Sequence, residues 1–325
     1  MAPTGVKRQH YVPEFFLESF TGPDDLLRVV DLEEGKEFRT NPTNAAVESH
    51  FNNLETGGEV LSTEGWLSQL EGEASPLLKS LTENPDEITS LSVEDEFFIA
   101  RFVAALRFRT PQFRSVMGDM IESISTRSRE MLRAQVIAQY PEEERPFVWE
   151  QIEEQFDQRW FGKSGTLQPA NLSTSMLGEV QGYANLLWCA PWRIGTVPTG
   201  LKLYTSDNPV AAYERPVRER WETAAFASLI YYVPLSPSIL LKIERRPDDQ
   251  DDSDPRGGRR RQDFTTEEIS VARHVVTRDS VRLLFGEGLI VPRDCATSCL
   301  DRIGKAKLRF AAHYLGFDPR PPRFP

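Results

Sequence analysis

The residues best suited to chemistry lie in two polar segments that are far apart in the chain. The first contains Arg8, Gln9, His10 and Tyr11 at the start of an expected short helix, whose first backbone N–H groups favour a nearby anion. His10 is a candidate general base, general acid or metal ligand. A lone histidine is more often a hydrogen-bonded structural residue, so both interpretations stay open.

The second segment is Ser206, Asp207, Asn208 and Pro209, which follows an expected strand over residues 201–205. Strand ends are common places for site residues. Asp207 is suited to binding a metal, orienting His10 or activating water, with Ser206 and Asn208 as ligand contacts. The same residue types are also what a simple turn requires, because their side chains hydrogen-bond the local backbone and proline restricts φ.

Two charged residues fall on helix faces that are otherwise apolar. Glu71 interrupts the stripe of an expected helix over 64–81, and Arg109 continues the stripe of the next helix. An unpaired buried charge costs several kcal/mol, so we expect Glu71 and Arg109 to lie near each other or near a shared polar ligand. A structural ion pair that braces the two helices is the alternative, and Arg109 could also reach water at the helix end. The stripes consist of Leu67, Leu70, Ala74, Leu77, Leu78 and Leu81, then Phe98, Phe102, Ala105 and Leu106.

Composition limits the class of protein. A net charge of −11 over 325 residues argues against the overall basic surface that nonspecific nucleic-acid binding usually needs, although a local basic cleft is compatible with it. No apolar run approaches the ~20 residues of a membrane span, and the first residues lack the apolar core of a signal peptide. Three cysteines without framework spacing are typical of a reducing compartment. We therefore expect a soluble cytoplasmic protein that does not associate with membranes.

The elements that position these residues are expected to form one α+β domain. Residues 1–189 are predicted to be a large helical part with a small hairpin at 26–32 and 36–40, and residues 190–325 a sheet-containing part. That sheet should be antiparallel or mixed, with short strands, and closed by C-terminal helices. The predicted helices cover 11–20, 64–81, 92–109, 111–139, 141–160, 173–188, a segment from 265 and 294–314; another helical stretch begins at Asn41 and includes Val47 and Leu54. The predicted late strands cover 192–197, 201–205, 229–233 and 239–243, and the charged run 247–263 is expected to be a mobile loop.

Taken together, these motifs resemble the domain-of-unknown-function 4238 family of microbial proteins. The resemblance rests on Lys-Arg-Gln-His-Tyr-Val-Pro at 7–13, Leu-Glu at 70–71, Arg-Thr-Pro at 109–111 and Thr-Ser-Asp-Asn-Pro at 205–209, in that order over nearly the whole chain. The family often has an asparagine early in the helix after the last strands, where this chain has Ser270. The resemblance implies no activity, but it implies that His10, Glu71, Arg109 and Asp207 belong to one pattern.

The resulting functional expectation is an intracellular hydrolase, with a phosphodiesterase or nuclease as the leading type. His10, Asp207 and Glu71 would be its catalytic residues, a divalent metal is one candidate cofactor, and Arg8 and Arg109 would hold an anionic group. The alternative is a non-catalytic sensor or binding module for an anionic small molecule or a nucleic-acid end. The sequence determines neither the substrate nor the oligomeric state.

Overall fold

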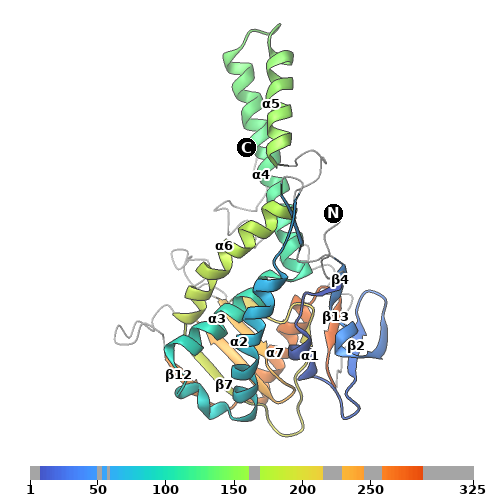
Figure 1. Ribbon diagram of the computed structural model, residues 1–325, viewed down its shortest axis with the longest axis vertical. Helices are drawn as coiled ribbons and strands as arrows, with labels where there is room; N and C mark the ends of the chain where they lie inside the picture. The colour runs from blue at the N-terminus through green and yellow to red at the C-terminus, as the bar shows by residue number, and fades with distance from the viewer. Residues whose placement is uncertain are drawn as a thin grey trace, which may run out of the picture.

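The computed structural model describes residues 8–49, 53–56, 59–160, 169–214, 229–244 and 258–287, and these form the α+β fold that the sequence predicts (Figure 1). The helices are α1 (Glu14–Glu18), α2 (Glu64–Glu83), α3 (Val93–Phe108), α4 (Pro111–Gln139), α5 (Arg145–Trp160), α6 (Pro169–Trp188) and α7 (Thr266–Asp279), with 3-10 turns η1 (Pro42–Asn44) and η2 (Pro85–Thr89). The early strands are β1 (Arg8–His10), β2 (Leu27–Asp31), β3 (Lys36–Thr40), β4 (Val47–Ser49), β5 (Asn53–Thr56) and β6 (Glu59–Ser62). The later strands are β7 (Trp192–Thr196), β8 (Thr205–Ser206), β9 (Ala211–Glu214), β10 (Leu229–Pro234), β11 (Ile239–Glu244), β12 (Arg259–Arg261) and β13 (Leu283–Phe285).

A five-stranded mixed sheet, in the order β12-β7-β11-β10-β9, forms the centre of the molecule. Successive side chains of a strand point to opposite faces. Tyr231 and Val233 of β10 therefore join the main hydrophobic core, with residues of α1, α2, α3 and α6, whereas Ile230 and Tyr232 pack in a second core with α7. Because both faces are covered, β10 and β11 are almost continuously apolar.

A second, four-stranded sheet in the order β3-β2-β13-β8 connects distant parts of the chain. The predicted hairpin is confirmed as β2 and β3, and β13 pairs antiparallel with β2 on one side and with β8 on the other. A two-stranded ribbon, β1 with β4, aligns His10 with Val47. The late strand β13 thus brings the segment after α7 beside both β2 and the end of β8, next to Asp207.

Side-chain hydrogen bonds cap the starts of α3, α4 and α7. Ser92 caps α3 by accepting from the backbone N–H of Asp95, and Thr110 caps α4 in the same way from Phe113. Thr265 and Glu268 form a reciprocal capping box at the start of α7. The apolar stripe of α2 is buried as expected, whereas Leu77 is only partly buried.

Two of the expected elements are wrong or only partly right. The helix expected from Asn41 lasts one 3-10 turn, because the chain reverses at Ala46 (φ 51°) and pairs as β4 with β1, and Leu54 lies in β5. The strand expected over 201–205 is only β8, and β9, β12 and β13 had no sequence signal strong enough to predict them.

The charged run 247–263 is not a loop throughout. Arg259–Arg261 pair in parallel with β7, and the guanidinium of Arg259 donates to the carbonyl oxygens of Trp188 at 2.7 Å and Ala190 at 2.9 Å. Arg259 thus supplies hydrogen-bond donors to two carbonyl oxygens, and its guanidinium stacks on the ring of Trp192. These contacts fix the segment around Arg259 against β7. Residues 247–257 and the helix expected over 294–314 lie outside the described residues.

Candidate functional site

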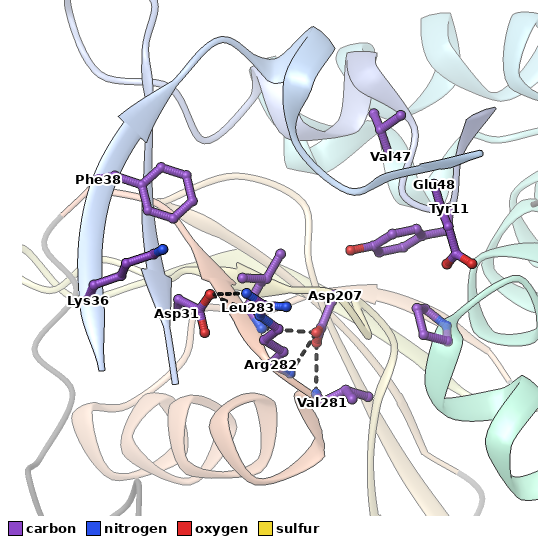
Figure 2. A pocket seen from close by; sticks show the side chains of 11 residues that line it. Tyr11, Asp31, Lys36, Phe38, Val47, Glu48, Asp207, Val281, Arg282 and Leu283 are labelled. Atoms are coloured by element: carbon purple, nitrogen blue, oxygen red, sulfur yellow. Dashed lines mark hydrogen bonds and ion pairs between the residues drawn. The ribbon is translucent and has the colours of Figure 1, made fainter. Parts of the chain in front are cut away.

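A cavity of about 720 Å³ opens where the β1–β4 ribbon, the four-stranded sheet and the start of α4 meet (Figure 2). It combines apolar walls with charged and hydroxyl groups, which is the usual make-up of a ligand pocket of this size. Two of its polar residues, Tyr11 and Asp207, come from the two segments that the sequence singles out. The lining residues are Tyr11, Asp31, Lys36, Phe38, Val47, Glu48, Pro111, Asp207, Val281, Arg282 and Leu283.

Tyr11 is held by its backbone and presents its ring to the cavity. Its N–H donates to the carbonyl oxygen of Ala46 at 2.9 Å, and its own carbonyl oxygen accepts from Nε of Arg109 at 2.9 Å. The hydroxyl points into the cavity on the side of Asp207 (Figure 2). Burial raises the pKa of Tyr11 well above its usual value, and the negative charges of Asp207 and Glu48 raise it further while Arg282 opposes them. Tyr11 is therefore a neutral hydroxyl in a negative local field.

Asp207 forms the floor of the cavity and is almost completely buried. Its Oδ1 accepts from the N–H of Val281 at 2.8 Å, and its Oδ2 accepts from the N–H groups of Arg282 at 2.7 Å and Leu283 at 2.9 Å. The hydrogen bonds that hold this carboxylate in the described part of the chain therefore come from backbone N–H groups. Burial raises the pKa of Asp207 to about 6, although hydrogen bonds from the backbone N–H groups of Leu283, Val281, Arg282 and Asp207 itself lower it.

The residues on either side of Asp207 hold the turn that aims it. The hydroxyl of Ser206 donates to the carbonyl oxygen of Asn208 at 2.9 Å and accepts from the N–H of Asn208 at 3.1 Å. The amide of Asn208 donates to Gln112 at the start of α4 and to the carbonyl oxygen of Asp279 at 3.1 Å. Both residues are buried and neither lines the cavity. Their polar groups serve the turn, as the alternative interpretation of this segment holds.

Glu71 and Arg109 meet, as the two helix stripes predict. Nη1 of Arg109 donates to Oε1 of Glu71 at 2.5 Å, and the exposed side-chain fractions are 5% for Arg109 and 28% for Glu71. The same guanidinium holds the carbonyl oxygen of Tyr11. Its Nη2 is buried without a hydrogen-bond partner in the described part of the chain. The pair therefore lies behind Tyr11 and fixes its backbone.

The sequence pattern of a family described as Protein of unknown function (DUF4238) matches residues 8–286 of the chain. The chain belongs to this family. No curated protein and no solved structure matches it. The matched range contains the cavity, the Glu71–Arg109 pair and the Asp207 turn, so the DUF4238 assignment covers the whole candidate site.

The remaining predicted residues of this DUF4238 protein do not line the cavity. Arg8 is exposed on β1 and donates to Oδ1 of Asn44 at 3.0 Å, and Gln9 is buried. His10 is half-buried, and its Nε2 lacks a hydrogen-bond partner among the described residues. Thus Tyr11, and not His10, lines the cavity together with Asp207. His10 is the last residue of β1 and directly precedes Tyr11 in the chain.

Several lining residues escaped the sequence analysis because their surroundings come from sheet pairing. Asp31 ends β2 and accepts from Nε of Arg282 at 2.9 Å and from its Nη2 at 2.6 Å. Burial alone would raise the pKa of Asp31, but the hydrogen bonds from Arg282 hold it below its usual value. Lys36 and Phe38 come from β3 and lie at the left in Figure 2, across the cavity from Tyr11. An isolated aspartate or arginine at a strand end gives no signal of a partner 251 positions away.

Two further properties bear on the class of site. Within the residues that the structure describes, no three His, Cys, Asp or Glu side chains are grouped so that they could hold a metal ion. None of the described helices combines the length and apolar character that crossing a bilayer requires.

Proposed function

We propose that the cavity is a binding site for a small organic molecule with a flat apolar body and a cationic or hydrogen-bond-donating head. The head would lie at Asp207, beside the hydroxyl of Tyr11. The body would lie against the apolar wall made by Phe38, Pro111 and Leu283. The chain would then act as a sensor or binding module.

The observation that carries this proposal is the buried environment of the Asp207 carboxyl group. Within the described residues this carboxylate forms no ion pair, although it is almost fully buried. A buried charge that is compensated only by backbone N–H groups gains from a cationic partner. The cations nearby are already engaged, since Arg282 pairs with Asp31 and Lys36 pairs with Glu34. The field at the Tyr11 hydroxyl supports the same ligand class, because Asp207 and Glu48 outweigh Arg282 there.

An anionic ligand is matched less well by this geometry. Arg8 is at the surface beside Asn44, and Arg109 is occupied by Glu71 and by the backbone of Tyr11. Arg114 of α4 lies within electrostatic reach of Glu48. It would compensate that rim carboxylate more readily than it would reach Asp207. We therefore favour a cationic or neutral donor ligand over a phosphate or a nucleic-acid end.

The proposal can be tested on the full chain by saturation-transfer NMR with small aryl compounds of different charge. The probes are benzamidine, benzylamine, benzyl alcohol, benzoate and phenyl phosphate. We expect binding by the two cations, in the weak range typical of fragments, and weaker binding as the pH falls below about 6, where Asp207 becomes protonated. Tyr11→Phe should lower their affinity about fivefold by removing one hydrogen bond. Tyr140→Phe is the matched control, because Tyr140 is an exposed residue far from the cavity at the end of α4.

The result that would contradict this proposal is tighter binding of benzoate or phenyl phosphate than of benzamidine. Equal effects of Tyr11→Phe and Tyr140→Phe would also contradict it, because the bound probe would then lie elsewhere. Asp207→Asn is less informative alone, since an amide can replace only some of the acceptors that three backbone N–H groups require.

A hydrolase is the second candidate, and the pKa of Asp207 favours it. A carboxyl group with a pKa of about 6 is close to the range in which general acid–base catalysis is efficient near neutral pH. In this version Asp207 would exchange a proton with bound substrate and Tyr11 would donate a hydrogen bond. Hydrolysis of bis-(p-nitrophenyl) phosphate or p-nitrophenyl acetate that disappears in Tyr11→Phe, but not in Tyr140→Phe, would support it. Absence of turnover of both compounds would leave the binding module as the better proposal.

A further inference from the structure

A helical arm extends from the body of the protein (Figure 1). It consists of the outer part of α4, the turn at 140–144 and α5, and we call residues 125–157 the arm. Its two helices bury Val136 and Phe156 between them. Arg129 stacks on Phe156 at 5.2 Å and Arg133 stacks on Trp149 at 5.1 Å. These contacts hold the arm together away from the main core, since cation–π stacking adds to a small apolar interface.

The end of the arm presents apolar side chains to solvent. Of the eight large hydrophobic residues that are exposed in the described part of the chain, four lie on the arm. Phe147 is 64% exposed, Ile137 54% and Tyr140 38%. Met131, the fourth of these residues, precedes Ile137 on α4. Arg145 donates to the carbonyl oxygens of Ile137 and Tyr140, both at 3.0 Å, and so joins the start of α5 to the end of α4. We call Ile137, Tyr140 and Phe147 the tip.

The tip is surrounded by negative charge. Residues 137–154 contain six glutamates and one arginine, a net charge of −5. Glu142, Glu143 and Glu144 occupy the turn and are exposed. A second copy of this acidic tip, or a nucleic acid, would be repelled. Apolar side chains with an acidic rim complement an apolar surface with a basic rim, and such a partner would gain from both.

We propose that the tip is a docking surface for a protein segment that presents apolar side chains flanked by lysine or arginine, such as a basic amphipathic helix. The aromatic and aliphatic side chains of the tip supply the apolar contact, and aromatic residues are the usual anchors of such interfaces. The glutamates of the turn select a basic partner and speed its approach. This role is independent of the cavity, which lies at the other end of α4, at Pro111.

The test uses a fluorescein-labelled amphipathic helical peptide of leucine and lysine, about four turns long, and fluorescence anisotropy with the full chain. Two control peptides accompany it. One has glutamate in place of every lysine, and the other has the same leucine and lysine content in an order without an apolar face. We expect the first peptide alone to bind well, with an affinity that falls as the salt concentration rises.

Variants of the chain separate the apolar and the charged contributions. Ile137→Ser with Phe147→Ser should weaken binding at least about tenfold. Val271→Ser on α7, which changes an exposed apolar residue outside the arm, should leave binding unchanged. Replacing the three turn glutamates by glutamine should weaken binding and reduce its salt dependence. Far-UV circular dichroism of each variant checks that the helices are retained.

Three results would overturn the proposal. Equal binding of the leucine–lysine peptides with and without an apolar face would mean that the net charge of the chain attracts any cationic peptide. Unchanged binding after the double serine substitution would place the peptide elsewhere. Light scattering that shows a dimer, dissociated by Phe147→Ser, would identify the tip as a contact between copies of this chain.

Discussion

The Glu71–Arg109 pair permits a sharp test of how the site is held together. Arg109 is nearly fully buried, and its guanidinium bonds both Glu71 at 2.5 Å and the carbonyl oxygen of Tyr11 at 2.9 Å. Removing one partner of a buried ion pair costs about 3–5 kcal/mol. Because the Glu71 side chain is 28% exposed, water replaces part of its contribution, and we expect Glu71→Ala to cost about 2–3 kcal/mol.

Arg109→Ala should cost more, about 3–5 kcal/mol, because it also leaves the buried carbonyl of Tyr11 without its charged donor. The double variant should cost little more than Arg109→Ala alone, which gives a coupling energy of about 2 kcal/mol. Glu73→Ala is the matched control on the same helix. Among the described residues Glu73 accepts one surface hydrogen bond, from Gln69, so its loss should change stability by less than about 0.5 kcal/mol.

Urea unfolding midpoints of the wild type, the two single variants, the double variant and the control suffice for the measurement. If Glu71→Ala and Arg109→Ala each change the free energy of unfolding as little as Glu73→Ala does, and their effects simply add, the buried ion pair is refuted. Arg109 would then be solvated. Single variants that keep wild-type stability but lose benzamidine binding would show instead that the pair serves the ligand, because functional sites often hold unfavourable charge.

Three further predictions concern the charged residues and glycines of the fold. Arg259→Ala should destabilise by about 3–5 kcal/mol in urea unfolding, because Arg259 bonds two carbonyl oxygens and lies 3.4 Å from the buried carboxylate of Glu96, whereas the exposed Arg260→Ala should be near neutral. Gly195→Ala would place its Cβ 2.1 Å from the carbonyl oxygen of Gln262 and should lower the melting temperature clearly, while Gly72→Ala, with open space around it in α2, should raise it slightly. Asp207 has a pKa of about 6 in the folded protein against 3.8 as a free group, so its contribution to stability is fully present below about pH 4 and is lost as the pH rises through 6, a change of roughly 3 kcal/mol. The urea concentration at the unfolding midpoint should therefore fall as the pH is raised from 4 to 7. A midpoint that stays constant or rises over this range, and that Asp207→Asn does not alter, would contradict the raised pKa of Asp207.

The sequence alone determined the features that depend on residues close together in the chain. Ser92, Thr110 and Thr265 cap the helices that follow them, and these hydrogen bonds are local because those of a cap span only three residues. The stripes through Glu71 and Arg109 predicted their contact correctly, because a buried charge has few alternatives to a charged partner. The late strands β7, β10 and β11 followed from apolar runs that a sheet covered on both faces requires.

Only the tertiary structure decided which residues share the cavity. Asp31 and Arg282 meet because β13 pairs with β2, and a three-residue strand has too little periodicity to predict its partner. The side chain of Asp207 is aimed by N–H groups more than seventy positions away, so its burial and raised pKa leave no trace in the turn sequence itself. Likewise, Arg259 looks like part of a solvated charged run until the parallel pairing of β12 with β7 sets it over Trp192. In each case the deciding interaction is a long-range backbone pairing, whose energy depends on the whole fold and very little on the residues beside it in the chain.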